Sequence, residues 1–169
     1  MLSTFDRALI RCNRWAVIAI LGAMAVMVFA NVALRFLTDH SIVWVEEVSR
    51  YLMIWLTFLG AGLVLRYGGH IGIDTLQNVF PRGALAIRVA IYGLLLVFFG
   101  AMLWLGARYA VLAWAQTTPV MQIPIGAVYL AIPLGFGLLM IHLVLMTIPY
   151  LRHGQFLADA EFDADAAKL

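Results

Sequence analysis

The chain contains four long apolar stretches, and these limit what it can fold into. A helix needs about 20 predominantly apolar residues to cross the hydrocarbon core of a bilayer. Each of the four stretches is that long. In lipid, only helices and closed barrels satisfy their backbone polar groups. The sequence therefore predicts an all-α integral membrane protein with four transmembrane helices. Their expected bounds are residues 15–36, 43–66, 88–115 and 125–150.

The composition agrees with this prediction. The chain is 64% hydrophobic and 12% charged, whereas soluble domains are about 45–50% apolar and about 25% charged. A net charge of +2 is too small to indicate nucleic-acid binding. The single cysteine, Cys12, excludes an intramolecular disulfide and a cysteine-based zinc site. The sequence contains no nucleotide-binding loop, nucleophile elbow or metal-ligand spacing, so we expect neither a cofactor nor enzymatic activity.

The positions of the basic residues predict the topology. They lie before the first apolar stretch, around the connection between the second and third, and after the fourth, whereas the other two connections contain no lysine or arginine. Basic residues are retained on the cytoplasmic side of a membrane, so both termini are expected in the cytoplasm. The residues concerned are Arg7, Arg11, Arg14, Arg66, Arg82, Arg88, Arg152 and Lys168.

Two segments outside the spans have recognisable patterns. In residues 67–83 a pair of glycines is followed by apolar residues at helical spacing and then by Pro81, which predicts a short interfacial helix between the second and third spans. Residues 155–169 are rich in Asp, Glu and Ala and predict an acidic, flexible cytoplasmic tail. Residues 1–154 would then form the four-helix transmembrane domain.

Charged residues are concentrated at the start of the second stretch. Isolated charges at bilayer depth are costly, at roughly 2.5–3.5 kcal/mol each. On a helix, Arg50 lies four residues after Glu46 and three after Glu47, so both carboxylates can reach its guanidinium. We expect these three residues to form a structural charge cluster. Arg35 and Arg108 fall at similar depth and either join this cluster or extend separately to the lipid headgroups.

Other residues bear on helix packing. His142 lies in the fourth span and either bonds to a neighbouring helix or ligates haem; we expect the first, because no second histidine lies at matching depth. Gly60, Ala61 and Gly62 thin the second helix and permit close contact, either within this chain or with a partner. Pro133 predicts a kink in the outer half of the fourth span.

The residues from Trp44 to Ala61 read W-V-E-E-V-S-R-Y-L-M-I-W-L-T-F-L-G-A. This stretch resembles the small membrane subunit of tripartite ATP-independent periplasmic (TRAP) transporters. A second marker of that family, a basic residue followed by H-I-x-x-D, is similar to the residues from Arg66 to Asp74. The resemblance thus assigns the family's motifs to Glu46, Glu47 and Arg50 and to Arg66, His70 and Asp74.

The resemblance implies a complex in the bacterial cytoplasmic (inner) membrane. In this family a large membrane subunit carries substrate and sodium sites and moves them by an elevator mechanism, and a periplasmic binding protein delivers the substrate, commonly an organic acid. The small subunit would be a compact bundle that stabilises the immobile scaffold and contacts membrane lipids. The alternative is a self-sufficient, proton-coupled exporter that acts as a homodimer, which requires an unpaired acidic residue deep in a span.

Overall fold

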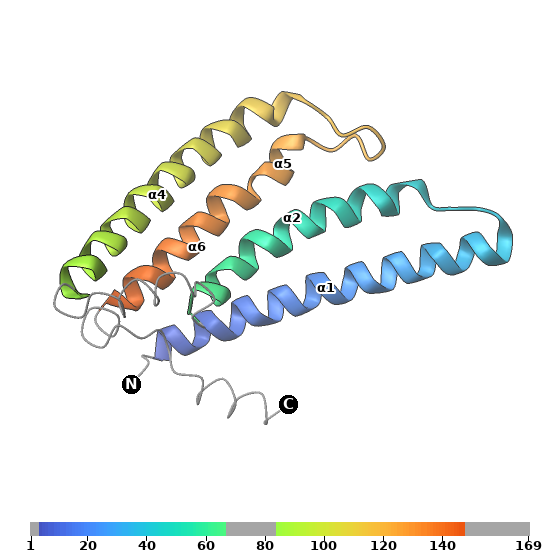
Figure 1. Cartoon of the computed structure of the whole chain (residues 1–169). Helices are drawn as coiled ribbons and strands as arrows, with labels where there is room; N and C mark the ends of the chain where they lie inside the picture. Colours follow the sequence, from blue (N-terminus) through green and yellow to red (C-terminus); the bar gives the residue numbers. More distant parts are fainter. Residues whose placement is uncertain (1–3, 67–83, 148–169) are drawn as a thin grey trace, which may run out of the picture.

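The computed structural model describes residues 4–66 and 84–147, which form an all-helical array (Figure 1). Four segments are long and apolar enough to cross a membrane, which confirms the prediction of four spans. The predicted interfacial helix and acidic tail, together with His70 and Asp74, lie outside the described residues. The elements are α1 (Thr4–Thr38), α2 (Val43–Arg66), α4 (Ala84–Leu112), the 3-10 helix η2 (Ala113–Ala115), α5 (Ile125–Tyr129) and α6 (Ala131–Leu145).

The long helices lie side by side in the order α1, α2, α6, α4 (Figure 1). In the described part of the chain, α1 makes extensive contacts with α2 alone, α2 also contacts α6, and α6 contacts α4. The expected compact bundle is therefore replaced by an open row with α1 and α4 at its edges. A row is stable in lipid because apolar helix faces need not be buried against protein there.

The centre of the row lies where α2, α6 and α4 meet. The ring centroid of Phe136 on α6 is 5.8 Å from that of Phe98 and 5.9 Å from those of Phe58 and Phe99. Gly135 lets α6 approach α2, because a Cβ added at this position would lie 2.6 Å from the Cβ of Phe58. The fourth span, Ile125–Leu145, which comprises α5 and α6, is the most enclosed of the four.

The fourth span is interrupted at Leu130, between α5 and α6. Pro133 has no N–H group and cannot bond to the carbonyl of Tyr129, four residues earlier. The regular pattern resumes with Leu134, whose N–H group donates to the carbonyl of Leu130 at 3.2 Å. The interruption lies within one turn before Pro133, whereas the predicted kink stays a prediction.

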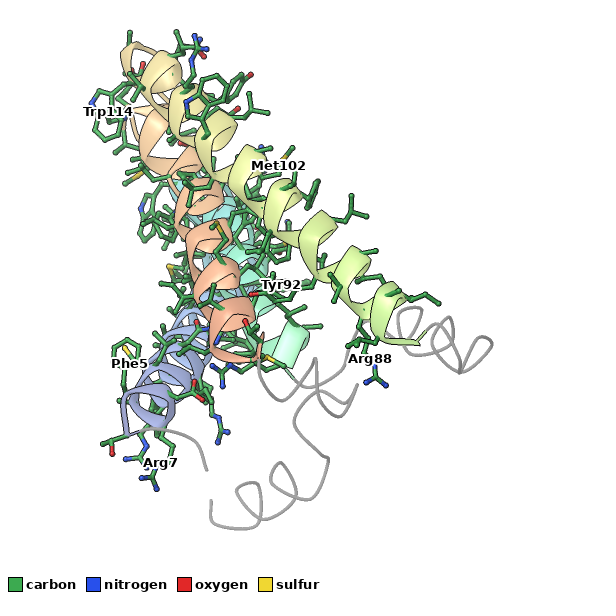
Figure 2. All side chains as sticks on the ribbon, turned by 90° about the vertical axis from the view of Figure 1, so that its left-hand side faces the viewer. Phe5, Arg7, Arg88, Tyr92, Met102 and Trp114 are labelled. Atoms are coloured by element: carbon green, nitrogen blue, oxygen red, sulfur yellow. The ribbon has the colours of Figure 1, made fainter. Side chains whose placement is uncertain are left out.

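The two ends of the row differ in charge. Arg7 and Arg88 lie at one end and Trp114 lies at the other (Figure 2). We call the end that contains the start of α1 and the end of α2 the arginine-rich end, and the end that contains the start of α2 and the end of α4 the opposite end. This separation is the feature on which the topology prediction depends.

Candidate functional site

Most of the buried polar side chains are arranged around α2. Asn31 of α1 accepts a hydrogen bond at 2.6 Å from the N–H group of Ile42, just before α2 begins. Asn13 of α1 donates to the carbonyl of Leu59 on α2 at 3.1 Å. The remaining buried polar residues form one cluster at each end of α2. Within residues 4–66 and 84–147, the seven buried polar residues are Asp6, Asn13, Asn31, Glu47, Arg66, Thr118 and His142.

Arg66 is the centre of the first cluster, at the arginine-rich end. It is the last residue of α2 and is completely buried. Its Nη2 donates to Oδ1 of Asp6 on α1, and its Nε donates to Nδ1 of His142 on α6 at 2.7 Å. One guanidinium therefore joins three neighbouring helices. The prediction that His142 is a structural residue bonded to a neighbouring helix is confirmed.

The geometry of His142 follows from this bond and from the space beside it. Because Nδ1 accepts a hydrogen bond from Nε of Arg66, the neutral imidazole carries its own hydrogen on Nε2. The ring lies against Gly62, where an added Cβ would be 2.6 Å from Cδ2 of His142. Gly62 therefore serves packing within this chain, and Ala61 packs beside the hydrophobic core. Gly60 differs, because an added Cβ there would meet no heavy atom within 4 Å.

Glu47 is the centre of the second cluster, at the opposite end. Its side chain is buried, and its carboxylate accepts hydrogen bonds from the N–H groups of Val120 at 2.8 Å and Met121 at 3.4 Å. A hydrogen bond within the loop that supplies these donors joins its two sides: Thr118, which is fully buried, donates its N–H to the carbonyl of Ile123 at 2.9 Å. Glu47 thus ties the start of α2 to the connection between α4 and α5.

The structure does not bring Glu46, Glu47 and Arg50 together. Glu46 and Arg50 are exposed, and within the described residues neither forms an ion pair or a hydrogen bond. Glu47 accepts hydrogen bonds from two backbone N–H groups of the 117–123 loop instead of pairing with Arg50. The spacing that permitted a common contact is present, but the expected charge cluster is not formed within this chain.

Arg35 and Arg108 do not join Glu46, Glu47 and Arg50, and the expectation that they extend to the lipid headgroups stays a prediction. The guanidinium carbon of Arg35 lies 5.9 Å from the ring centroid of Phe36. That of Arg108 lies 5.1 Å from the ring centroid of Trp104. Both side chains are exposed, on the two edge helices. Each arginine is therefore accommodated by an aromatic neighbour on its own helix.

Asp6 and Asn13 were not singled out from the sequence, because they precede the first apolar stretch. The signal that could have found them is periodic. Asp6, Ile10 and Asn13 are spaced by four and three residues, and all three are buried on one face of α1. No group of three or more His, Cys, Asp or Glu side chains within residues 4–66 and 84–147 could hold a metal ion.

Comparisons with known proteins agree on one family. A family model described as the DctQ component of tripartite ATP-independent periplasmic transporters matches residues 24–153. The chain is similar to the ectoine TRAP transporter small permease protein TeaB of Halomonas elongata, with 32% identity over 143 residues, which is 80% of this chain and 72% of the relative. It is also similar to a putative TRAP transporter small permease protein of Haemophilus influenzae, with 35% identity over 123 residues, which is 68% of this chain and 71% of the relative. The isethionate TRAP transporter permease protein DctMQ of Oleidesulfovibrio alaskensis is 29% identical over 105 residues, which is 60% of this chain and 16% of that protein.

Proposed function

The chain belongs to the family of DctQ components, the small permease subunits of TRAP transporters, and from this we propose that it stabilises the large membrane subunit as a fixed scaffold. It is a multi-pass inner-membrane protein, and small subunits of this kind work with a large membrane subunit. The proposal concerns what this chain contributes to that complex: a helix layer that does not change shape while the large subunit moves.

The observation that carries the proposal is the anchoring of α2 at both ends. At one end Arg66 bonds to α1 and α6, and at the other end Glu47 bonds to the loop between α4 and α5. Bending or sliding α2 would break buried polar contacts, which are expensive to lose in a low-dielectric interior. A row of helices held in this way supports a role as a platform rather than as a moving part.

The proposal extends to the transport cycle. The large subunit would carry substrate and sodium through the membrane by an elevator movement, and this chain would broaden the static part against which the elevator moves. A periplasmic binding protein would deliver the substrate, and sodium would drive uptake. Relatives are named for ectoine and for isethionate. We propose a small organic solute of this kind, such as an organic acid, as the cargo of the complex.

We further propose that the arginine-rich end faces the cytoplasm. Arg7 and Arg88 lie at this end (Figure 2), and the positive-inside rule favours the cytoplasmic side for such residues. Both termini would then be cytoplasmic, residues 67–83 would lie along the inner membrane surface, and residues 155–169 would form a cytoplasmic tail. The 117–123 loop held by Glu47 would face the periplasm.

The alternative, a self-sufficient proton-coupled exporter, has less support. Such an exporter needs a protonatable carboxylate in the interior of a span. In the described helices the acidic residues lie near the ends: Asp6 in the first turn of α1, and Glu46 and Glu47 in the first turns of α2. Asp6 and Glu47 are also hydrogen-bonded. These positions suit structural contacts better than a proton pathway.

Reconstitution into liposomes tests the proposal. The large subunit, this chain, both together, and both with the binding protein are compared under an inward sodium gradient. We expect uptake only when both membrane chains and the binding protein are present. Arg66→Met in this chain should lower uptake, whereas the exposed control Arg35→Met should not. Uptake by this chain alone, or full uptake without it, would refute the scaffold role.

A further inference from the structure

One face of α2 stays uncovered along its whole length. Its residues follow one another at spacings of three or four, so they form a single line on the helix surface. We call this line the α2 stripe. It consists of Glu46, Arg50, Met53, Thr57, Gly60 and Val64, of which all except the partly buried Gly60 are exposed.

The α2 stripe differs chemically from the outer faces of the edge helices. In the spans of α1 and α4, the polar side chains have partners: Asn31 accepts from Ile42, and Tyr92 bonds to Thr147 at 2.6 Å. Arg35 and Arg108 are exposed near the ends of these spans, each beside an aromatic ring of its own helix. Most of the remaining exposed surface is apolar, with side chains such as Phe29 and Val97. Lipid chains solvate such surfaces as well as protein does, so they provide little reason for association.

The charges of the α2 stripe lack such partners. Within the described residues, Glu46 and Arg50 form no ion pair, hydrogen bond or ring contact. Next to them, Oγ of Ser49 is buried without a hydrogen-bond partner. α2 has 24 residues and is roughly 36 Å long, and Arg50 lies roughly 10 Å along it, inside a hydrocarbon core of about 30 Å. With α2 centred on that core, Arg50 is placed where lipid chains do not satisfy its guanidinium, whereas Glu46 lies close to the edge of the core.

The middle of the α2 stripe is suited to close helix contact. Thr57 donates its hydroxyl to the carbonyl of Met53 at 2.8 Å, so it presents mainly its methyl group. Three residues further on, Gly60 faces open space, with no heavy atom within 4 Å of an added Cβ. A smooth surface with a glycine at its centre lets a second helix backbone approach closely.

We propose that a membrane helix of the large subunit docks on the α2 stripe, with a carboxylate of that helix facing Arg50 and a small residue facing Gly60. The inference rests on the proposed function, because it takes the occupant from there. Charge complementarity selects this occupant: an exposed guanidinium inside the hydrocarbon region requires an anion, and Glu46, one turn away, requires a donor. The apolar face of α1 offers no comparable requirement.

Three glycines make a matched steric test. Gly60 on α2, Gly22 on α1 and Gly93 on α4 each have open space at the position of an added Cβ. The Cβ of a leucine at any of them meets no heavy atom within 4 Å, and leucine favours helix over glycine. The large subunit is co-expressed with each affinity-tagged variant and recovered in mild detergent. We expect Gly60→Leu to lower its recovery at least tenfold, and Gly22→Leu and Gly93→Leu to leave it within twofold.

A charge test accompanies the steric one. Arg50→Glu should lower recovery at least tenfold, and reversal of one acidic membrane residue of the large subunit should restore it; Arg108→Glu serves as the control. Equal thermal midpoints of the isolated variants exclude misfolding as the cause.

Loss of the complex in Gly22→Leu or Gly93→Leu, but not in Gly60→Leu, would overturn this inference and leave the scaffold function standing. Unchanged recovery in both Gly60→Leu and Arg50→Glu would show that Arg50 reaches the lipid headgroups, which also overturns it. If the unsubstituted chain recovers no large subunit, the proposed function fails as well.

Discussion

Removing the guanidinium of Arg66 tests whether the buried cluster holds the helix row together. Arg66 is completely buried and the Asp6 side chain is 7% exposed. Arg66→Met therefore removes the Arg66 guanidinium from the Asp6 carboxylate, and breaking a buried pair from one side costs about 3–5 kcal/mol. We expect the free energy of unfolding of the isolated chain to fall by this amount. The ratio of folded to unfolded chain would then fall roughly 150- to 5,000-fold.

The double variant gives the sharper result. Asp6→Leu alone should also cost about 3–5 kcal/mol, because it leaves the buried Arg66 guanidinium without this carboxylate, although it spares the bond from Arg66 to His142. Asp6→Leu combined with Arg66→Met removes both charges, and apolar replacement of a buried pair is often nearly neutral. His142 then lacks the donor to its Nδ1, which costs about 1–3 kcal/mol. We therefore expect the double variant to be more stable than either single variant.

Reversible unfolding in mixed micelles, followed by tryptophan fluorescence, measures these differences. The control is Arg35→Met, an exposed arginine of α1, for which we expect a change within about 0.5 kcal/mol. Single-variant costs below about 1 kcal/mol, or costs that simply add in the double variant, would refute the reasoning. Either result would mean that Asp6 and Arg66 do not depend on one another.

Two further predictions concern the other contacts of α2. Glu47→Gln replaces one acceptor oxygen by a donor, so the backbone amides of residues 116–124 should exchange hydrogen roughly 5- to 150-fold faster. The exposed Glu46→Gln should leave their exchange rates unchanged. Equal exchange in both variants, measured by mass spectrometry, would contradict the contact between Glu47 and this loop. Gly135→Ala should destabilise the chain by about 1–3 kcal/mol, because its Cβ would lie 2.6 Å from that of Phe58. Gly93→Ala, where the added Cβ lies in open space, should stabilise the chain by up to about 1 kcal/mol. Thermal midpoints that shift in the same direction in Gly135→Ala and Gly93→Ala would contradict the close contact between Gly135 and Phe58.

The sequence was sufficient to predict the spans because bilayer thickness sets their length. The second span was expected at residues 43–66, and α2 covers Val43–Arg66. The order of the helices in the row could not be predicted in the same way. A helix that is apolar on all sides carries no pattern that indicates which side faces protein, and in lipid no hydrophobic force selects one. The small residues were equally ambiguous: Gly62 packs against His142, whereas Gly60 faces open space.

Local spacing was also insufficient to predict the partners of the charged residues. Glu47 and Arg50 are close enough on a helix to pair, yet Glu47 bonds to the backbone of Val120, 73 residues away. A backbone N–H group in a loop has no helical signature, and any residue type can supply it. Asp6 was overlooked because it lies in a polar segment that precedes the first apolar stretch. This segment was interpreted as lying outside the membrane span, but α1 begins at Thr4 and continues through it.

The charges of α2 are divided between two tasks. Glu47 and Arg66 are buried, and each is hydrogen-bonded to groups of this chain. Glu46 and Arg50 are exposed and remain available to a partner. If the first pair holds the platform and the second pair binds the large subunit, the two effects must separate experimentally. Substitution of Arg66 or Glu47 should destabilise the isolated chain, whereas substitution of Arg50 should leave the isolated chain intact and weaken only the complex. A helix whose four charges all affected the isolated chain equally would be a folding element alone and could not be assigned a docking role.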